Sequence, residues 1–144
     1  ITRLRKLLNA IDDKSNEIII CERSIYTDKF VFAKMLYQQG YINEIEWQSY
    51  NYWFDTFKEK TNVDSIIYIN TEPNICFDRI KKRNRNGESS IPLEYLTHCH
   101  QLHHEWLHEN EKDNIINFNG NIELSEDNQH EYINQLNMFM ESQC

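Results

Sequence analysis

The sequence predicts an α/β fold in which a parallel sheet is flanked by helices. Three short, mostly β-branched runs, at residues 17–21, 65–69 and 115–118, alternate with longer stretches of helical spacing, and this alternation is typical of parallel α/β units. The run at 17–21 is continuously apolar after Glu17, which predicts a strand that is buried on both faces. The 144 residues are enough for one domain, and domains of about 150 residues bury roughly 68–70% of the extended chain's surface.

In the first half of the chain, apolar residues at 1, 4, 7, 8 and 11 predict a helix over residues 1–11. Helical spacing returns over residues 26–39, and Gly40 suits the left-handed position that ends a helix. Asn43 can cap the next helix, with Glu46 three residues later as in a capping box. We expect that helix to reach about residue 60.

In the second half, Pro73 fits the first turn of a helix that follows the strand at 65–69 and reaches about residue 82. Residues 81–90 are polar and predict a loop. Pro92 opens a further helix to about residue 110. After the strand at 115–118, the amphipathic stretch 125–140 predicts a last helix.

Composition excludes several classes of protein. The three glycines, Gly40, Gly87 and Gly120, are too far apart for a phosphate loop, a dinucleotide fingerprint or a G-x-S-x-G nucleophile elbow. A formal net charge of −8 argues against binding a nucleic acid polymer, and no apolar run reaches the about 18 residues of a membrane helix. The four cysteines have no paired spacing and no signal peptide is visible, which predicts a cytoplasmic protein.

Glu22-Arg23-Ser24 follows the first predicted strand, at the edge of a parallel sheet where ligands bind. A carboxylate there can hold a hydrated Mg²⁺, and an arginine fork can steady an oxyanion. A surface ion pair, with Ser24 as a helix cap, is the alternative. Asp28 and Phe32 share a helical face just beyond and could contact a nucleobase, although Asp28 could equally be a first-turn helix charge.

A basic cluster lies in the second half: five of the 15 lysines and arginines fall within residues 79–85. Arg79 and Arg83 are four residues apart and share a helical face, so that together with Arg85 they could wrap a triphosphate. A solvated helix end, where cations are favoured, is equally consistent with the pattern. Glu88 follows in the loop and would matter only if this loop closed over a polyol.

Two other patterns compete for a role. His104-Glu105-x-x-His108 matches the zinc-protease motif H-E-x-x-H, with Glu105 as base, but Asn114 stands where the extended motif has its third histidine. The aromatic series Trp47, Tyr50, Trp53, Phe54 and Phe57 at helical spacing fits a core or a subunit interface. A zinc hydrolase and a catalytically inert nucleotide-binding or assembly module therefore remain alternatives.

In this order and spacing, the segments resemble deoxyribonucleoside kinases. Residues 22–32 look like the E/D-R-S segment of that family, residues 43–50 like its next helix, and residues 79–96 like its lid and following helix. His104-Glu-Trp-Leu107 is similar to the usual ending of the last of these helices. The match runs from about residue 18 to 107 and is weaker towards the C-terminus.

The resemblance implies a P-loop kinase-like parallel sheet with an arginine-rich lid at about residues 79–91. It also implies ATP-dependent phosphorylation of the 5′-hydroxyl of a deoxyribonucleoside, with Mg²⁺. On the nucleoside side, the resemblance implies that Glu22 would hold Mg²⁺ through water and that Arg23 would lie beside the 5′-hydroxyl. Asp28 and Phe32 would line the base pocket, and Glu88 would bind the sugar 3′-hydroxyl. On the ATP side, the phosphates would be clamped by Arg79, Arg83 and Arg85, and the adenine would lie over Asn119-Gly120-Asn121.

The family's glycine-rich phosphate loop and catalytic carboxylate have no counterpart in these residues. We therefore expect residues 1–144 to be the C-terminal portion of a single kinase domain, without its first strands and inactive alone. The expected partners are a deoxyribonucleoside, a nucleoside triphosphate donor and a second copy in a homodimer, with no nucleic acid polymer and no membrane. An organellar targeting sequence in the absent N-terminus stays open.

Overall fold

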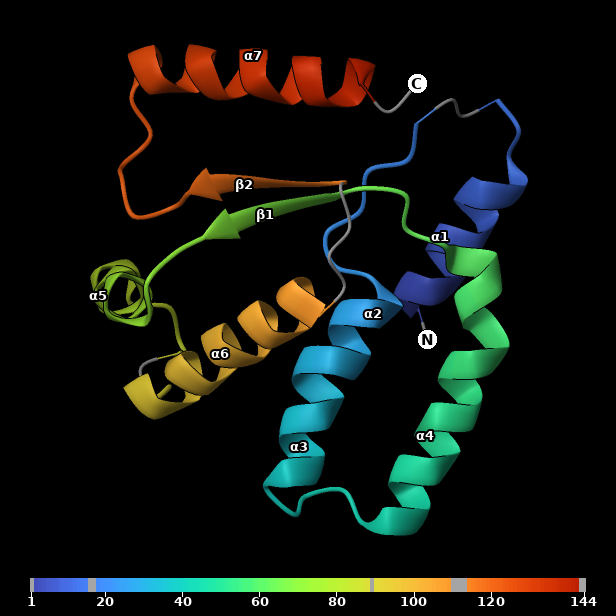
Figure 1. Ribbon diagram of the computed structural model, residues 1–144. Coiled ribbons are helices and arrows are strands. Elements are labelled where there is room, and N and C mark those ends of the chain that lie inside the picture. Colours follow the sequence, from blue (N-terminus) through green and yellow to red (C-terminus); the bar gives the residue numbers. More distant parts are fainter. Residues whose placement is uncertain (1, 16–17, 89, 110–113, 143–144) are drawn as a thin grey trace. The chain divides into compact units, whose positions relative to one another are not determined.

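The computed structural model describes residues 2–15, 18–88, 90–109 and 114–142 (Figure 1). Its elements, in chain order, are α1 (Thr2–Asp12), α2 (Ile25–Thr27), η1 (Asp28–Ala33), α3 (Lys34–Gln38), α4 (Glu44–Phe57), η2 (Lys58–Thr61), β1 (Ile66–Asn70), α5 (Pro73–Arg83), α6 (Leu93–Glu109), β2 (Ile115–Asn119) and α7 (Glu126–Glu141). They form two compact units. The first contains residues up to 63 and 102–106, and the second contains residues 64–101 and those from 107 on.

The first unit is helical, and its helix after Ser24 is not a plain α-helix. The helix predicted at 26–39 is present as α2, η1 and α3 in direct succession, but η1 is a π-helix, in which the backbone N–H of Lys34 donates to the carbonyl of Lys29. Gly40, with φ of 75°, ends the helix as predicted. Short π-helical segments of this kind occur frequently at functional sites.

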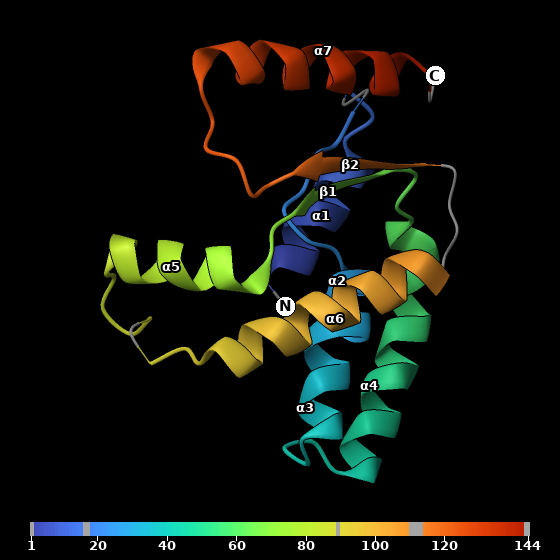
Figure 2. The ribbon, with the colours of Figure 1, turned by 60° about the vertical axis from the view of Figure 1, so that its left-hand side comes forward.

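Helix α4 runs antiparallel to α3, beside it (Figures 1 and 2). The predicted capping box is confirmed: the Asn43 side chain accepts from the backbone N–H of Glu46 at 3.0 Å, and the Glu46 carboxylate accepts from the N–H of Asn43 at 2.9 Å. The helix continues as the 3₁₀-helix η2, close to the predicted end at residue 60. Buried apolar side chains of this unit include Val31, Met35 and Leu102.

The second unit contains a two-stranded parallel sheet. β1 pairs with β2 in a register that sets Ile66 opposite Ile115 and Asn70 opposite Asn119, which confirms the strands predicted at 65–69 and 115–118. α7 lies on one side of this sheet and α5 on the other (Figures 1 and 2). The ring of Phe118 packs against that of Tyr132 on α7, with the centroids 5.0 Å apart.

Local signals predict most helix ends of the second unit. Pro73 is the first residue of α5, as predicted. Ser125 and Asn128 form a capping box at the start of α7, which ends at Glu141 against a predicted 140. Of the helices in the described ranges, none combines the length and apolar composition that crossing a bilayer requires.

The strand predicted at residues 17–21 is wrong. Glu17 lies outside the described residues, and Ile18 to Cys21 have no strand conformation. Their side chains are exposed, with Ile18 at 59% and Ile20 at 71%, rather than buried on both faces. The physical reason is that a strand needs a neighbouring backbone for its hydrogen bonds, and the sheet of the described residues consists of β1 and β2.

The burial of Met35 gives a first testable prediction, with Met138 as its matched control. In the intact protein, Met35→Ala should lower the free energy of unfolding by about 2–5 kcal/mol, because the 2% exposed side chain leaves a cavity. Met138→Ala removes the same atoms from a 71% exposed position and should change the free energy of unfolding by less than about 0.5 kcal/mol. Urea denaturation measures both, and equal losses would contradict this packing.

Candidate functional site

The segment Glu22-Arg23-Ser24 forms a bend directly before α2. Arg23 has a φ of 64°, in the left-handed region, which is uncommon for a residue with a side chain and costs about 1–3 kcal/mol. Such strain is concentrated at functional sites. It favours the functional interpretation of this segment over the alternative of a plain surface ion pair.

Ser24 stands at the N-cap position of α2, as the sequence allowed, but its side chain makes no capping hydrogen bond. Its backbone carbonyl accepts from the N–H of Asp28 at 3.1 Å. Glu22, the expected magnesium ligand, is exposed. The segment therefore presents a carboxylate and a guanidinium side by side on a constrained backbone.

Arg23 is held by Phe32, its expected neighbour in the nucleoside site. The guanidinium carbon lies 4.6 Å from the centroid of the Phe32 ring, which is a cation–π contact. The ring of His103 meets Phe32 edge-on from α6, with the centroids 6.3 Å apart. The structure thus brings together a residue expected beside the 5′-hydroxyl and one expected beside the base.

Asp28 opens the π-helix η1, and its carboxylate lies near Tyr50 of the aromatic series on α4. Burial, with the nearby Asp28 carboxylate as a second cause, raises the pKa of Tyr50 to about 12, so the phenol stays protonated near neutral pH. Its Oη is buried and has no hydrogen-bond partner among the described residues. Asp28 and Tyr50 come from different helices, and no pattern along the chain links them.

The expected lid, about residues 79–91, includes the end of α5 at Arg83. Asn84, with φ of 48°, and Gly87, with φ of 86°, turn the chain, so the loop starts later than the predicted residue 81. Arg83 donates to one oxygen of Glu88 from Nε at 3.1 Å and from Nη2 at 2.5 Å. The expected phosphate ligand and the expected sugar ligand therefore bind each other, while Arg85 is exposed.

Arg79 has different partners, although it precedes Arg83 by only one helical turn. Its guanidinium donates to the backbone carbonyls of Gly120, Asn121 and Ile122, at 2.5, 3.3 and 3.2 Å. The first two of these carbonyls belong to the loop that was expected to lie under the adenine, and Ile122 follows it directly. The structure thus places one of the three predicted phosphate ligands against the predicted adenine loop.

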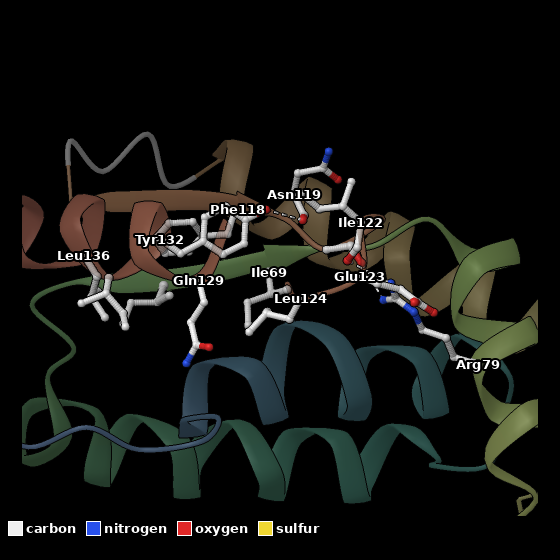
Figure 3. A pocket seen from close by; sticks show the side chains of 13 residues that line it. Ile69, Arg79, Phe118, Asn119, Ile122, Glu123, Leu124, Gln129, Tyr132 and Leu136 are labelled. Atoms are coloured by element: carbon white, nitrogen blue, oxygen red, sulfur yellow. Dashed lines mark hydrogen bonds between the residues drawn. The ribbon is translucent and has the colours of Figure 1, made fainter. Parts of the chain in front are cut away.

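A pocket of about 700 Å³ lies between the sheet and α7 (Figure 3). Its apolar wall includes Ile67, Ile69, Phe118, Tyr132, Ile133 and Leu136. Arg79, Ile122 and Glu123 gather at one end of it (Figure 3). The lining is mainly apolar, so the pocket does not account for phosphoryl transfer by itself.

The geometry gives the zinc hypothesis no support. Glu105, its expected base, forms an ion pair with Lys34 at 3.1 Å. The side chains of His104 and His108 are exposed on α6. Within the ranges that the structure describes, no three histidine, cysteine, aspartate or glutamate side chains lie close enough together to hold a metal ion.

The aromatic side chains of α4 form a continuous row of ring contacts that begins at Tyr37 of α3. The rings of Tyr37, Trp47, Tyr50, Trp53 and Phe57 follow one another with centroids 4.9, 6.0, 5.7 and 5.3 Å apart, while Phe54 is buried. Phe54 meets the core role within one chain, whereas Trp47, Tyr50, Trp53 and Phe57 are only half-buried, so the interface role stays open for them. A different stripe of α4 is open, since Ile45 and Tyr52 are both 79% exposed.

Known proteins match this chain over most of its length. A family model described as "Deoxynucleoside kinase" matches residues 1–141. Deoxycytidine kinase 2 of Gallus gallus is 39% identical over 117 residues, which cover 76% of this chain and 44% of that protein. Deoxycytidine kinase of Homo sapiens is 38% identical over 109 residues, with 73% and 42% covered, and mitochondrial deoxyguanosine kinase of Xenopus laevis is 34% identical over 109 residues, with 73% and 41% covered. The chain thus spans less than half the length of these three relatives.

Proposed function

Because the chain belongs to the deoxynucleoside kinase family, and so has its P-loop kinase-like α/β fold, we propose that the enzyme containing it phosphorylates deoxyribonucleosides. The reaction would move the γ-phosphoryl group of ATP to the 5′-hydroxyl, as a salvage step that yields the monophosphate. The observation that carries this proposal is the contact between Arg23 and Phe32 on a strained backbone. It joins a cation suited to phosphoryl transfer to a ring suited to a nucleobase.

Phosphoryl transfer depends mainly on positioning and on positive charge around the phosphate oxygens. Phe32 would stack on the base, and Arg23, fixed on the same ring, would lie beside the 5′-hydroxyl and the transferring group. Asp28 would bind the base edge. The exposed Glu22 carboxylate fits a magnesium ion held through water. When bound, that ion neutralises negative charge on the donor phosphates.

The lid would take part through an exchange of partners. Without ligands, Glu88 neutralises Arg83. The phosphates of ATP would draw Arg83 and Arg85 to themselves, which releases the Glu88 carboxylate to accept a hydrogen bond from the sugar 3′-hydroxyl. Surface ion pairs contribute at most about 1 kcal/mol, so the exchange costs little. The binding of the donor and of the nucleoside would thereby be coupled.

We also propose that the enzyme is a homodimer and acts in the cytoplasm. The dimer would form along the open stripe of α4, where Ile45 and Tyr52 are seven residues apart and thus on one face. The cytoplasmic location rests on the four cysteines without paired spacing. An inert nucleotide-binding module would share the fold, and turnover by the intact protein distinguishes it from the kinase.

The role of Arg23 can be tested in the intact enzyme. Arg23→Ala should cut turnover by at least about 1,000-fold, as loss of a charge-stabilising arginine does in other phosphoryl transferases. Alanine keeps the Cβ and therefore the backbone strain, so the circular dichroism spectrum should stay the same. Arg5→Ala, at an exposed position of α1, is the matched control. Unchanged turnover in the Arg23 variant would remove this residue from the mechanism.

Glu88 gives a prediction that compares two substrates. Glu88→Gln should raise KM for a deoxyribonucleoside roughly tenfold, because a hydrogen bond to a charged acceptor is weakened. The corresponding 2′,3′-dideoxynucleoside lacks the 3′-hydroxyl, so its KM should change by less than about twofold. Steady-state kinetics on both substrates measure the difference. Equal losses would assign Glu88 to its contact with Arg83 alone.

The proposed dimer can be tested at Tyr52. Tyr52→Glu places a charge on the open stripe of α4 and should convert the dimer to a monomer, because an uncompensated charge is costly to bury. Met138→Glu adds the same charge at a comparably exposed site on α7 and should leave the dimer intact. Sedimentation equilibrium gives the masses. A Tyr52 variant that stays dimeric would place the interface elsewhere.

A further inference from the structure

Arg79 has partners that suit a role other than phosphate binding. We propose that Arg79 is a positioning residue that holds the donor-base loop, residues 119–122, in the shape that receives the base of the triphosphate. It would not bind the phosphates. The inference deepens the proposed function and rests on it, because the loop has this task only in a kinase.

Arg79 donates hydrogen bonds to three consecutive backbone carbonyls of one loop. Its Nη1 donates to the carbonyl of Gly120, and its Nη2 donates to the carbonyls of Asn121 and Ile122. A guanidinium carries five N–H donors in a planar fork and no acceptor, so one side chain can bridge three consecutive carbonyls. A lysine ammonium is a compact point charge without this fixed geometry.

Other hydrogen bonds hold the same loop together with those of Arg79. The backbone N–H of Gly120 donates to the carbonyl of Asn70 at 2.7 Å. The N–H of Glu72 donates to Oδ1 of Asn121 at 2.8 Å, and the hydroxyl of Tyr132 donates to the carbonyl of Asn119 at 3.0 Å. The loop is therefore held from the end of β1, from α5 and from α7.

The loop approaches the end of β1 closely at Gly120. A Cβ on Gly120 would lie 2.0 Å from Oγ1 of Thr71 and 3.0 Å from the carbonyl oxygen of Asn70. The first distance is far shorter than real Cβ contacts and the second is at their tight limit, so a side chain at this position would force the neighbouring atoms to shift. Because of this close approach, the Arg79 side chain on α5 can reach the carbonyls of residues 120–122. Figure 3 shows Arg79 grouped with Ile122 and Glu123.

The comparison with Arg83 separates two roles on one helix. Arg83 pairs with a single side-chain carboxylate in the lid, and a phosphate can replace that partner. Arg79 pairs with three backbone carbonyls, which take three of its five N–H donors and turn the guanidinium towards the loop. The contacts thus assign phosphate binding to the Arg83 end of α5 and loop positioning to Arg79.

Steady-state kinetics of the intact enzyme test this assignment. Arg79→Ala should raise KM for ATP about tenfold or more and leave kcat within about threefold, and it should blur the preference between ATP and UTP. Arg79→Lys should not restore that preference, because an ammonium cannot bridge the three carbonyls. Lys82→Ala is the matched control, because it removes a charge from the same helix and an exposed contact to Glu123. Its KM and kcat should equal those of the parent enzyme.

Hydrogen exchange gives a readout that does not depend on catalysis. In Arg79→Ala the amides of Glu72 and Gly120 should exchange about tenfold faster or more, while amides within α4 keep their rates. If these amides keep their protection, the positioning role is overturned even where the enzyme is an active kinase. If kcat instead falls by orders of magnitude equally for ATP and UTP and Arg79→Lys restores it, Arg79 is a phosphate ligand and the proposal is wrong.

Discussion

The parallel ladder between β1 and β2 is the constraint on which the arrangement of the second unit depends. Because the register sets Asn70 opposite Asn119, the segments that leave the two strands emerge side by side, and the N–H of Gly120 meets the carbonyl of Asn70. Helix α5 starts only three residues after β1. Its second turn therefore lies beside the segment that comes after β2, and Arg79 reaches three carbonyls there. A shift of the register by one residue would separate all of these groups.

The two units hold their charged groups in different ways, and each way fits a different task. In the first unit, the guanidinium of Arg23 rests on the Phe32 ring, a partner that a substrate would join rather than displace. In the lid, Arg83 rests on Glu88, a partner with charge opposite to its own, which a phosphate can replace. Under the proposed function, a fixed contact suits a group that must stay beside the reacting atoms, and an exchangeable one suits a group that must respond to ligands.

Local signals account for the elements that the sequence predicted well. Asn43 with Glu46, Pro73 and the β-branched runs around Ile67 and Ile116 act through neighbours in the chain, and the corresponding elements agree with the structure within a few residues. The strand prediction at 17–21 was wrong because a strand needs hydrogen bonds to a neighbouring strand, and the residues of the run do not encode that neighbour. The partners of Arg79 were not predicted for a similar reason: they are backbone carbonyls, which every residue carries, so no sequence pattern marks them. The roles of Glu22, Asp28 and Arg85 come from the resemblance to a family and stay predictions.

The π-helix from Asp28 to Ala33 also decides which change of length this segment can absorb. Its backbone bonds reach five residues back, one residue more than in an α-helix. Deleting one residue would let ordinary α-helical bonding resume, and each backbone bond would still close about one turn. The helical segments on either side would therefore keep nearly the same relative orientation, with Met35 in the core and the bend at Glu22 and Arg23 in its place. The same deletion within the regular α-helix α4 would rotate one part of that helix by about 100° relative to the other.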